Sequence, residues 1–246
     1  MSLASSQLIG FGGRRASGAA ASGNDSFTKV LLHCNGTDGS TTFTDSNAGG
    51  SAHTWTASGN AQIDTAQSQF GGASGLFDGT GDWISTPDHA DFTLGSGNFV
   101  IDCWVRTTHS GLGYIAGQGD SGGQTVHISF AFVKTAGNLF QFALTPGGGY
   151  STITSTTTIN TGNWVHLAAV KTGTTVKLYV NGTKEGTDLT GAGTPNDSAY
   201  ELRVGAWGEI TSTPFNGWID EFRISIGTDR GWTGSSFTVP TAEYGP

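Results

Sequence analysis

Apolar and polar residues alternate along most of the chain in short runs, and this period of two predicts β-strands. In the segment 98–106 the odd-numbered positions from 99 to 105 are apolar and form one strand face. The opposite face carries Asp102, Trp104 and Arg106. Similar runs recur as far as residue 226, and none of them shows the apolar stripe of an amphipathic helix. The pattern therefore predicts about a dozen short strands and no long helix.

The turns between these runs favour antiparallel pairing. The segment 174–182, TTVKLYVNG, ends in Asn181-Gly182, which is a strong signal for a type I′ hairpin turn. Glycine makes up 40 of the 246 residues, as expected for a chain with many tight turns. Composition and periodicity do not change within residues 26–246. We therefore predict that these residues form one all-β domain, an antiparallel two-sheet β-sandwich of the jelly-roll type.

Residues 1–25 are predicted to form an extended N-terminal arm outside the sandwich. They contain a small apolar cluster at positions 8–11, arginines at positions 14 and 15, and then a Gly/Ala/Ser-rich tract. Because no apolar segment follows the arginines, we expect synthesis in the cytoplasm without a signal peptide. We expect the arm to dock either on its own domain or on a partner.

Charge and cysteine content exclude several classes of protein. Charged residues are only 12% of the chain and the net charge is −8, with the basic residues scattered, so nucleic-acid binding is disfavoured. No run of 18 apolar residues is present, so no segment is expected to span a membrane. Cys34 and Cys103 lie in apolar strand-like runs, and we expect two reduced core thiols, with a disulfide between them as the alternative.

Asp220 is the acidic residue with the most unusual position in the pattern. In the run 217–226 it alternates onto the same face as Trp218 and Phe222, so a regular strand would place its carboxylate in the core. A buried carboxylate without a partner is too costly to persist. Asp220 therefore needs a metal ion, a cationic side chain or several hydrogen bonds.

Carbohydrate binding requires an aromatic face on which a sugar ring stacks, with planar polar groups beside it. Trp104, flanked on its strand face by Asp102 and Arg106, offers this combination. Further candidates are aromatic residues in or beside Gly-rich segments, namely Tyr114, Tyr150 and Trp207. The alternative is that Trp104 lies beneath a second layer or beneath the arm.

Motifs of catalysis and of transition-metal binding are missing from the sequence. A retaining glycosidase needs carboxylates a few residues apart on one strand, in patterns such as ExDxE or ExDxxE, and the five glutamates form no such cluster. The six histidines form no HxH or HExxH pattern. We therefore expect a protein that is not an enzyme, and the sequence gives no support for a transition-metal site.

Four stretches of the sequence resemble the laminin-G-like jelly rolls of the concanavalin A-like lectin/glucanase superfamily, in the form found in bacteriophage structural proteins. They are VLLHCNGTDGSTTFTDS (30–46), AQSQFGGASGLFDGTGDWISTPDHADFTLGSGNFVIDCWVR (66–106), NWVHLAAVKTGTTVKLYVNG (163–182) and FNGWIDEFRISIGTDRGWTGSSFTVPTAEY (215–244). The resemblance implies a two-sheet jelly roll, binding of carbohydrate and a structural calcium ion. It suggests Asp220 as a calcium ligand, with Asp38 and Asp78 as further ligands from loops.

The sequence departs from the family pattern at two positions. Asn35 stands where an aspartate is usual, which weakens a calcium site in that loop, and Gly75 stands where a leucine is usual.

The function expected from this resemblance is that of a non-enzymatic phage virion protein that binds carbohydrate of the host cell surface. It would lie on the virion surface, in the tail or the capsid, as part of an oligomeric assembly, and contact other virion proteins through the N-terminal arm. Two alternatives stay open: a purely structural or decoration protein of the particle, and a polysaccharide-degrading enzyme.

Overall fold

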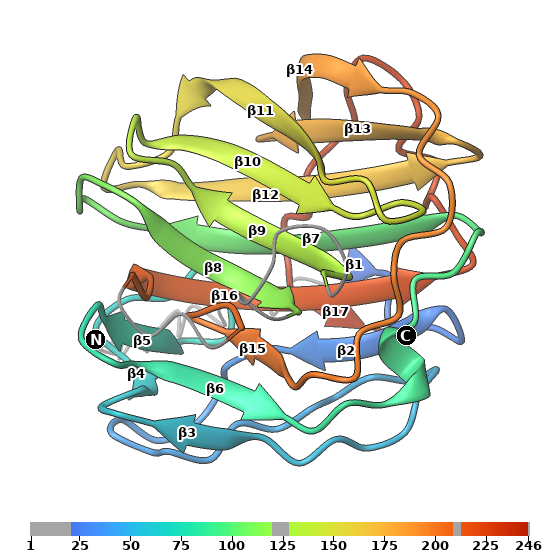
Figure 1. The fold of residues 1–246 in the computed structure, drawn as a ribbon. Coiled ribbons are helices and arrows are strands. Elements are labelled where there is room, and N and C mark those ends of the chain that lie inside the picture. The colour runs from blue at the N-terminus through green and yellow to red at the C-terminus, as the bar shows by residue number, and fades with distance from the viewer. Residues whose placement is uncertain (1–20, 120–127, 209–212, 246) are drawn as a thin grey trace, which may run out of the picture.

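In the computed structural model, the protein is an all-β sandwich of two antiparallel sheets (Figure 1). One sheet lies in front of the other in this view. The structure describes residues 21–119, 128–208 and 213–245. The predicted fold class is confirmed. In the described part, the one helical segment is the 3₁₀ turn η1 (Ala90–Phe92), and no helix there is long and apolar enough to cross a membrane.

The first sheet has seven strands, and β8, β9 and β10 lie next to one another near its middle, in the front layer of Figure 1. In spatial order its strands are β11 (Ser151–Thr158), β10 (Leu139–Leu144), β9 (Phe130–Lys134), β8 (Gly113–Gln118), β15 (Leu202–Val204), β6 (Trp83–Thr86) and β3 (Thr56–Ser58).

The second sheet has eight strands, and its long central pair is β7 and β16. In spatial order its strands are β14 (Thr183–Leu189), β13 (Thr175–Val180), β12 (Trp164–Thr172), β7 (Phe99–Arg106), β16 (Asn216–Ile226), β5 (Ser74–Asp78) and β4 (Gln62–Asp64), and β2 (Thr28–Leu32) also pairs with β16.

The core fills the space between the sheets and follows the alternation seen in the sequence. Phe130 and Phe132 of β9 point inward, whereas Ala131 and Val133 of the same strand belong to a separate cluster on the outer face. Cys103 of β7 and Cys34 are buried in the inner cluster, as expected for core cysteines, and both thiols are free.

The outer face of the eight-stranded sheet is covered by the C-terminal segment 228–245. Trp232 and Phe237 of this segment stack on each other, with ring centroids 3.9 Å apart, and pack on the buried Tyr179 of β13. The Tyr179 hydroxyl donates to the carbonyl oxygen of Trp232. The segment therefore forms a second layer over this face and excludes water from it.

The end of the predicted N-terminal arm lies against the domain. The short strand β1 (Ala21–Ser22) pairs in parallel with β17 (Tyr244–Gly245), and Asp25 forms an ion pair with Arg230 at 3.1 Å. Residues 1–20 of the arm lie outside the described residues. The domain thus includes the chain from Ala21 onward, a few residues before the boundary expected from composition.

Candidate functional site

Three of the six residues predicted to bind carbohydrate do not form a surface platform. Trp104 is only 6% exposed, because Phe70 and His166 pack against its ring. Asp102 is fully buried, and the half-buried Arg106 donates to the side chain of Gln67. The prediction of a sugar platform on this strand face is therefore wrong, since the C-terminal segment and the loop at 67–70 cover it.

Asp102 belongs instead to a buried polar network under the C-terminal segment. Its Oδ1 accepts from Arg223 Nε at 2.9 Å, and its Oδ2 accepts from the Tyr244 hydroxyl and lies 3.2 Å from His166 Nε2. Burial by itself would raise the pKa of Asp102, but Arg223, His166 and Tyr244 lower it to about 2. Asp102 is thus a charged structural residue that ties β7 to β16 and to the C-terminus.

The other three predicted residues, Tyr114, Tyr150 and Trp207, come together around one pocket on the outer face of the seven-stranded sheet. The pocket has a volume of about 250 Å³. Its lining consists of Leu112, Tyr114, Ile128, Ala131, Val133, Thr135, Ala136, Gln141, Ala143, Tyr150 and Trp207. We call it the Trp207 pocket.

Strand register explains why the sheet is hollow at this point. Gly117, Ala131 and Ala143 lie side by side on β8, β9 and β10 and form a row of very small outward positions. The neighbouring row on the same strands carries larger side chains, Tyr114, Val133 and Gln141. A row of small residues beside a row of large ones leaves a depression with an apolar floor.

Trp207 forms a wall of the depression because Gly117 lets its ring approach the sheet. A Cβ atom at position 117 would lie 2.4 Å from the Trp207 ring, so any other residue there would displace the indole. The Tyr114 ring lies 5.3 Å from that of Trp207, at an angle of 30°. Trp207 Nε1 is buried and has no hydrogen-bond partner in the described part of the chain.

The pocket combines this aromatic wall with polar groups at its rim. Tyr150 is 46% exposed and lies between β10 and β11. Burial raises the pKa of both Tyr114 and Tyr150, so their hydroxyls stay protonated at neutral pH and are able to donate hydrogen bonds. The site therefore offers stacking surfaces and hydroxyl donors.

Sequence reasoning missed Gln141, whose amide already donates to Thr154 Oγ1 at 2.8 Å. The sequence did contain a signal for it, because Gln141 stands between Phe140 and Phe142, which point inward, and must therefore face outward. An outward amide in a run of core phenylalanines marks a polar group on the outer face of the sheet.

The predicted calcium ligands Asp38, Asp78 and Asp220 are not brought together. Asp38 is exposed and accepts from the backbone N–H of Thr65 at 3.0 Å, and Asp78 is exposed and accepts from that of Thr80 at 2.7 Å. Among the described residues, no cluster with ligand atoms close enough to share a metal ion contains any two of the three aspartates. The three residues do not fit one structural calcium site.

Asp220 is buried as predicted, and backbone groups bond one of its two oxygens. Its Oδ2 accepts from the backbone N–H groups of Gln69 and Phe70 at 2.9 and 3.1 Å, while Oδ1 has no partner in the described part. Burial, together with the nearby Glu221, raises the pKa of Asp220 to about 8 against the effect of these hydrogen bonds. The raised pKa favours the protonated form of Asp220 at neutral pH.

The fold is thus a two-sheet sandwich with an aromatic pocket on one outer face. A family model described as the concanavalin A-like lectin/glucanases superfamily, of laminin-G type, matches residues 78–227, so the chain belongs to this family. No curated protein matches the chain in sequence.

Several solved structures share the fold at low sequence identity. The binding domain of botulinum neurotoxin serotype G has a TM-score of 0.60 and 15% identity, covering 83% of this chain and 48% of that one. The binding domain of Paraclostridial mosquitocidal protein 1 has a TM-score of 0.58 and 15% identity, covering 80% and 48%. Trypanosoma rangeli sialidase has a TM-score of 0.52 and 15% identity, covering 79% and 29%. The chain thus spans about half the length of the toxin binding domains.

Proposed function

We propose that the protein is a non-enzymatic carbohydrate-binding domain and that it holds its ligand in the Trp207 pocket. The observation that carries the proposal is the convergence of Tyr114, Tyr150 and Trp207 over a floor of small apolar residues. Aromatic rings stack on the apolar face of a sugar, and the tyrosine hydroxyls supply donors for its hydroxyl groups.

The size of the pocket favours a single sugar unit. Its volume of about 250 Å³ lies just below the range typical of small-molecule sites, about 300–1,000 Å³. A terminal or branch sugar would enter the pocket, and the rest of the glycan would extend past the exposed Tyr150.

The chemistry of the lining supports binding without catalysis. Glycoside hydrolysis generally uses two carboxyl groups on opposite sides of the scissile bond. Among the described residues, the lining of the Trp207 pocket has no aspartate, glutamate or histidine, and the titratable side chains there are tyrosines. Binding therefore fits the site better than the enzyme alternative.

The finer part of the proposal is that this domain belongs to a phage virion and recognises a bacterial surface glycan. The resemblance of the sequence to phage structural proteins supports the phage part of the proposal, and the fold shared with the receptor-binding domain of botulinum neurotoxin D supports a role in binding a receptor. Labelled protein should bind bacterial cells and lose that binding after periodate oxidation of their surface glycans. Unchanged binding after periodate would favour a protein receptor or a purely structural role.

Replacing Tyr150 with alanine should weaken glycan binding about ten-fold without changing the fold, because an exposed ring contributes stacking of ~1–1.5 kcal/mol. The measurement is a glycan array followed by titration with the best ligand. Trp207→Ala should weaken binding further, since it removes a wall of the pocket.

The matched control is Tyr200→Ala, because Tyr200 is 37% exposed and lies outside the Trp207 pocket. This variant should bind as the unmodified protein does. Equal losses in Tyr150→Ala and Tyr200→Ala would contradict the assignment of the pocket. Failure of the unmodified protein to bind any glycan would favour the structural alternative.

A further inference from the structure

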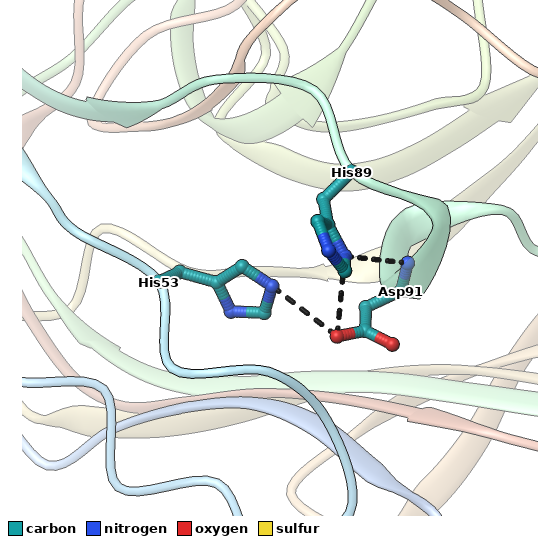
Figure 2. A group of neighbouring side chains, drawn as sticks. All are labelled: His53, His89 and Asp91. Carbon is teal, nitrogen blue, oxygen red and sulfur yellow. Dashed lines mark hydrogen bonds and ion pairs between the residues drawn. The ribbon is translucent and has the colours of Figure 1, made fainter.

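A second group of side chains lies away from the Trp207 pocket, at the turn η1. His53, His89 and Asp91 point toward one another, with His89 and Asp91 at the start of η1 and His53 on the segment that crosses beside it (Figure 2). One potential ligand atom from each residue lies within 4.8 Å of those of the other two. None of the three lines the Trp207 pocket.

Distances within this group match the geometry of a tetrahedral metal site. Asp91 Oδ2 lies 3.4 Å from His53 Nε2 and 3.2 Å from His89 Nδ1. Ligands bound to Zn²⁺ at ~2.0–2.1 Å in a tetrahedron are separated by about 3.3 Å. Two edges of the required ligand tetrahedron are therefore already present.

His53 is oriented in the way that metal-binding histidines usually are. Its Nδ1 lies 2.7 Å from Asp45 Oδ2, and the other oxygen of Asp45 accepts from the backbone N–H of Leu31 at 2.9 Å. A carboxylate on one ring nitrogen fixes the proton there and leaves the other nitrogen as a free lone pair. Asp45 thus directs the Nε2 lone pair of His53 toward Asp91.

The Nε2 atom of His53 lacks any hydrogen-bond partner in the described part, although the side chain is only 4% exposed. A lone pair that faces a carboxylate oxygen at 3.4 Å is repelled by it unless a cation lies between them. The pair therefore requires either a proton on Nε2 or a metal ion shared with Asp91.

His89 closes the group on the solvent side. Its side chain is 41% exposed, and its Nδ1 accepts from the backbone N–H of Asp91 at 3.1 Å. A metal ion on Nδ1 would replace that single hydrogen bond, and the exposed side of the ring leaves room for a water molecule as a fourth ligand. Phe92 packs against both imidazoles, with ring centroids 4.7 and 6.2 Å away, and limits their movement.

We infer that His53 Nε2, His89 and Asp91 form a binding site for a divalent transition-metal ion of the zinc type, with Asp45 as the positioning residue for His53. Two imidazoles and one carboxylate are ligands that suit Zn²⁺ rather than Ca²⁺, which prefers oxygen ligands. The ion would join the 45–53 segment to η1 and stabilise this end of the sandwich. The site is independent of glycan binding.

The test is titration of the metal-free full chain with ZnCl₂, followed by calorimetry and by thermal unfolding. We expect one ion per chain and a rise in the melting temperature with Zn²⁺ but not with Ca²⁺. His89→Ala should weaken Zn²⁺ binding about ten-fold or more, and Asp45→Asn about 10–100-fold, as for other second-layer partners of metal-bound histidines.

The matched control is His109→Ala, because His109 is an exposed histidine outside the group. This variant should bind Zn²⁺ as the unmodified protein does. Absence of stoichiometric Zn²⁺ binding would overturn the inference and assign a proton to His53 Nε2. Binding that persists unchanged in His89→Ala would overturn it as well.

Discussion

Replacement of Arg223 by alanine should destabilise the domain by ~3–5 kcal/mol, because it leaves the buried Asp102 carboxylate without its cation. Both side chains are almost fully buried, and Arg223 Nε donates to Asp102 Oδ1 at 2.9 Å. Arg223 also donates to the Gly23 carbonyl oxygen and lies 3.5 Å from the centre of the Tyr244 ring. The substitution therefore loosens both chain ends as well as the β7–β16 pair.

Urea unfolding at pH 7 measures this loss, and Lys184→Ala is the control. Lys184 pairs with Asp188 at the surface, with side chains 30% and 29% exposed, and such pairs contribute only ~0–1 kcal/mol. Similar losses in the two variants would show that His166 and Tyr244 alone stabilise the charge of Asp102.

The same ion pair determines how stability responds to acid. Because the pKa of Asp102 is lowered to about 2, its stabilising effect is fully present above the unfolded value of 3.8 and is lost as pH falls toward 2. Arg223→Ala should therefore show a smaller loss of stability between pH 4 and pH 2 than the unmodified protein.

Local patterns in the sequence predicted the sandwich well, because the alternation of apolar and polar residues within each strand shows which side chains face the core. Alternation in β7 separated the inward Cys103 from the outward Asp102 and Trp104, and the structure agrees with this division. What alternation does not show is whether an outward face meets water. Here the covering residues Trp232 and Phe237 are more than a hundred positions away, in an irregular segment without a strand pattern.

The same limit applies to the two candidate sites. Tyr114 and Trp207 were individually recognisable beside glycines, but their proximity depends on β8 and β15 being neighbours in the sheet. His53 and His89 are 36 positions apart and match no metal-binding motif, so their cluster exists only in three dimensions. Local sequence thus identified several of the chemical groups, whereas pairing of distant strands brought them together.

Asp220 shows that protonation must be considered beside metals, cations and hydrogen bonds when a carboxylate is predicted in a core. Two backbone N–H groups hold one of its oxygens, and the raised pKa keeps the group neutral. The raised pKa of Asp220 therefore costs folding free energy only as pH rises above about 4, where the unfolded chain releases this proton.

Asp220→Asn should stabilise the domain by ~4 kcal/mol more at pH 8 than at pH 5. The pKa of Asp220 is raised from 3.8 to about 8, so the folded state retains a proton that the unfolded chain releases above pH 4. Stability of the unmodified protein therefore falls by ~1.4 kcal/mol per pH unit from this group between pH 4 and pH 8, and asparagine removes that fall.

Urea unfolding of both proteins at pH 5 and pH 8 tests this difference, and Asp38→Asn is the control because it changes an exposed carboxylate. The stability gained from Asp220→Asn should increase with pH, whereas the effect of Asp38→Asn should stay small at both values. A gain that does not change with pH would mean that Asp220 is ionised in the folded protein. In that case these backbone hydrogen bonds or a bound cation would have to stabilise its charge.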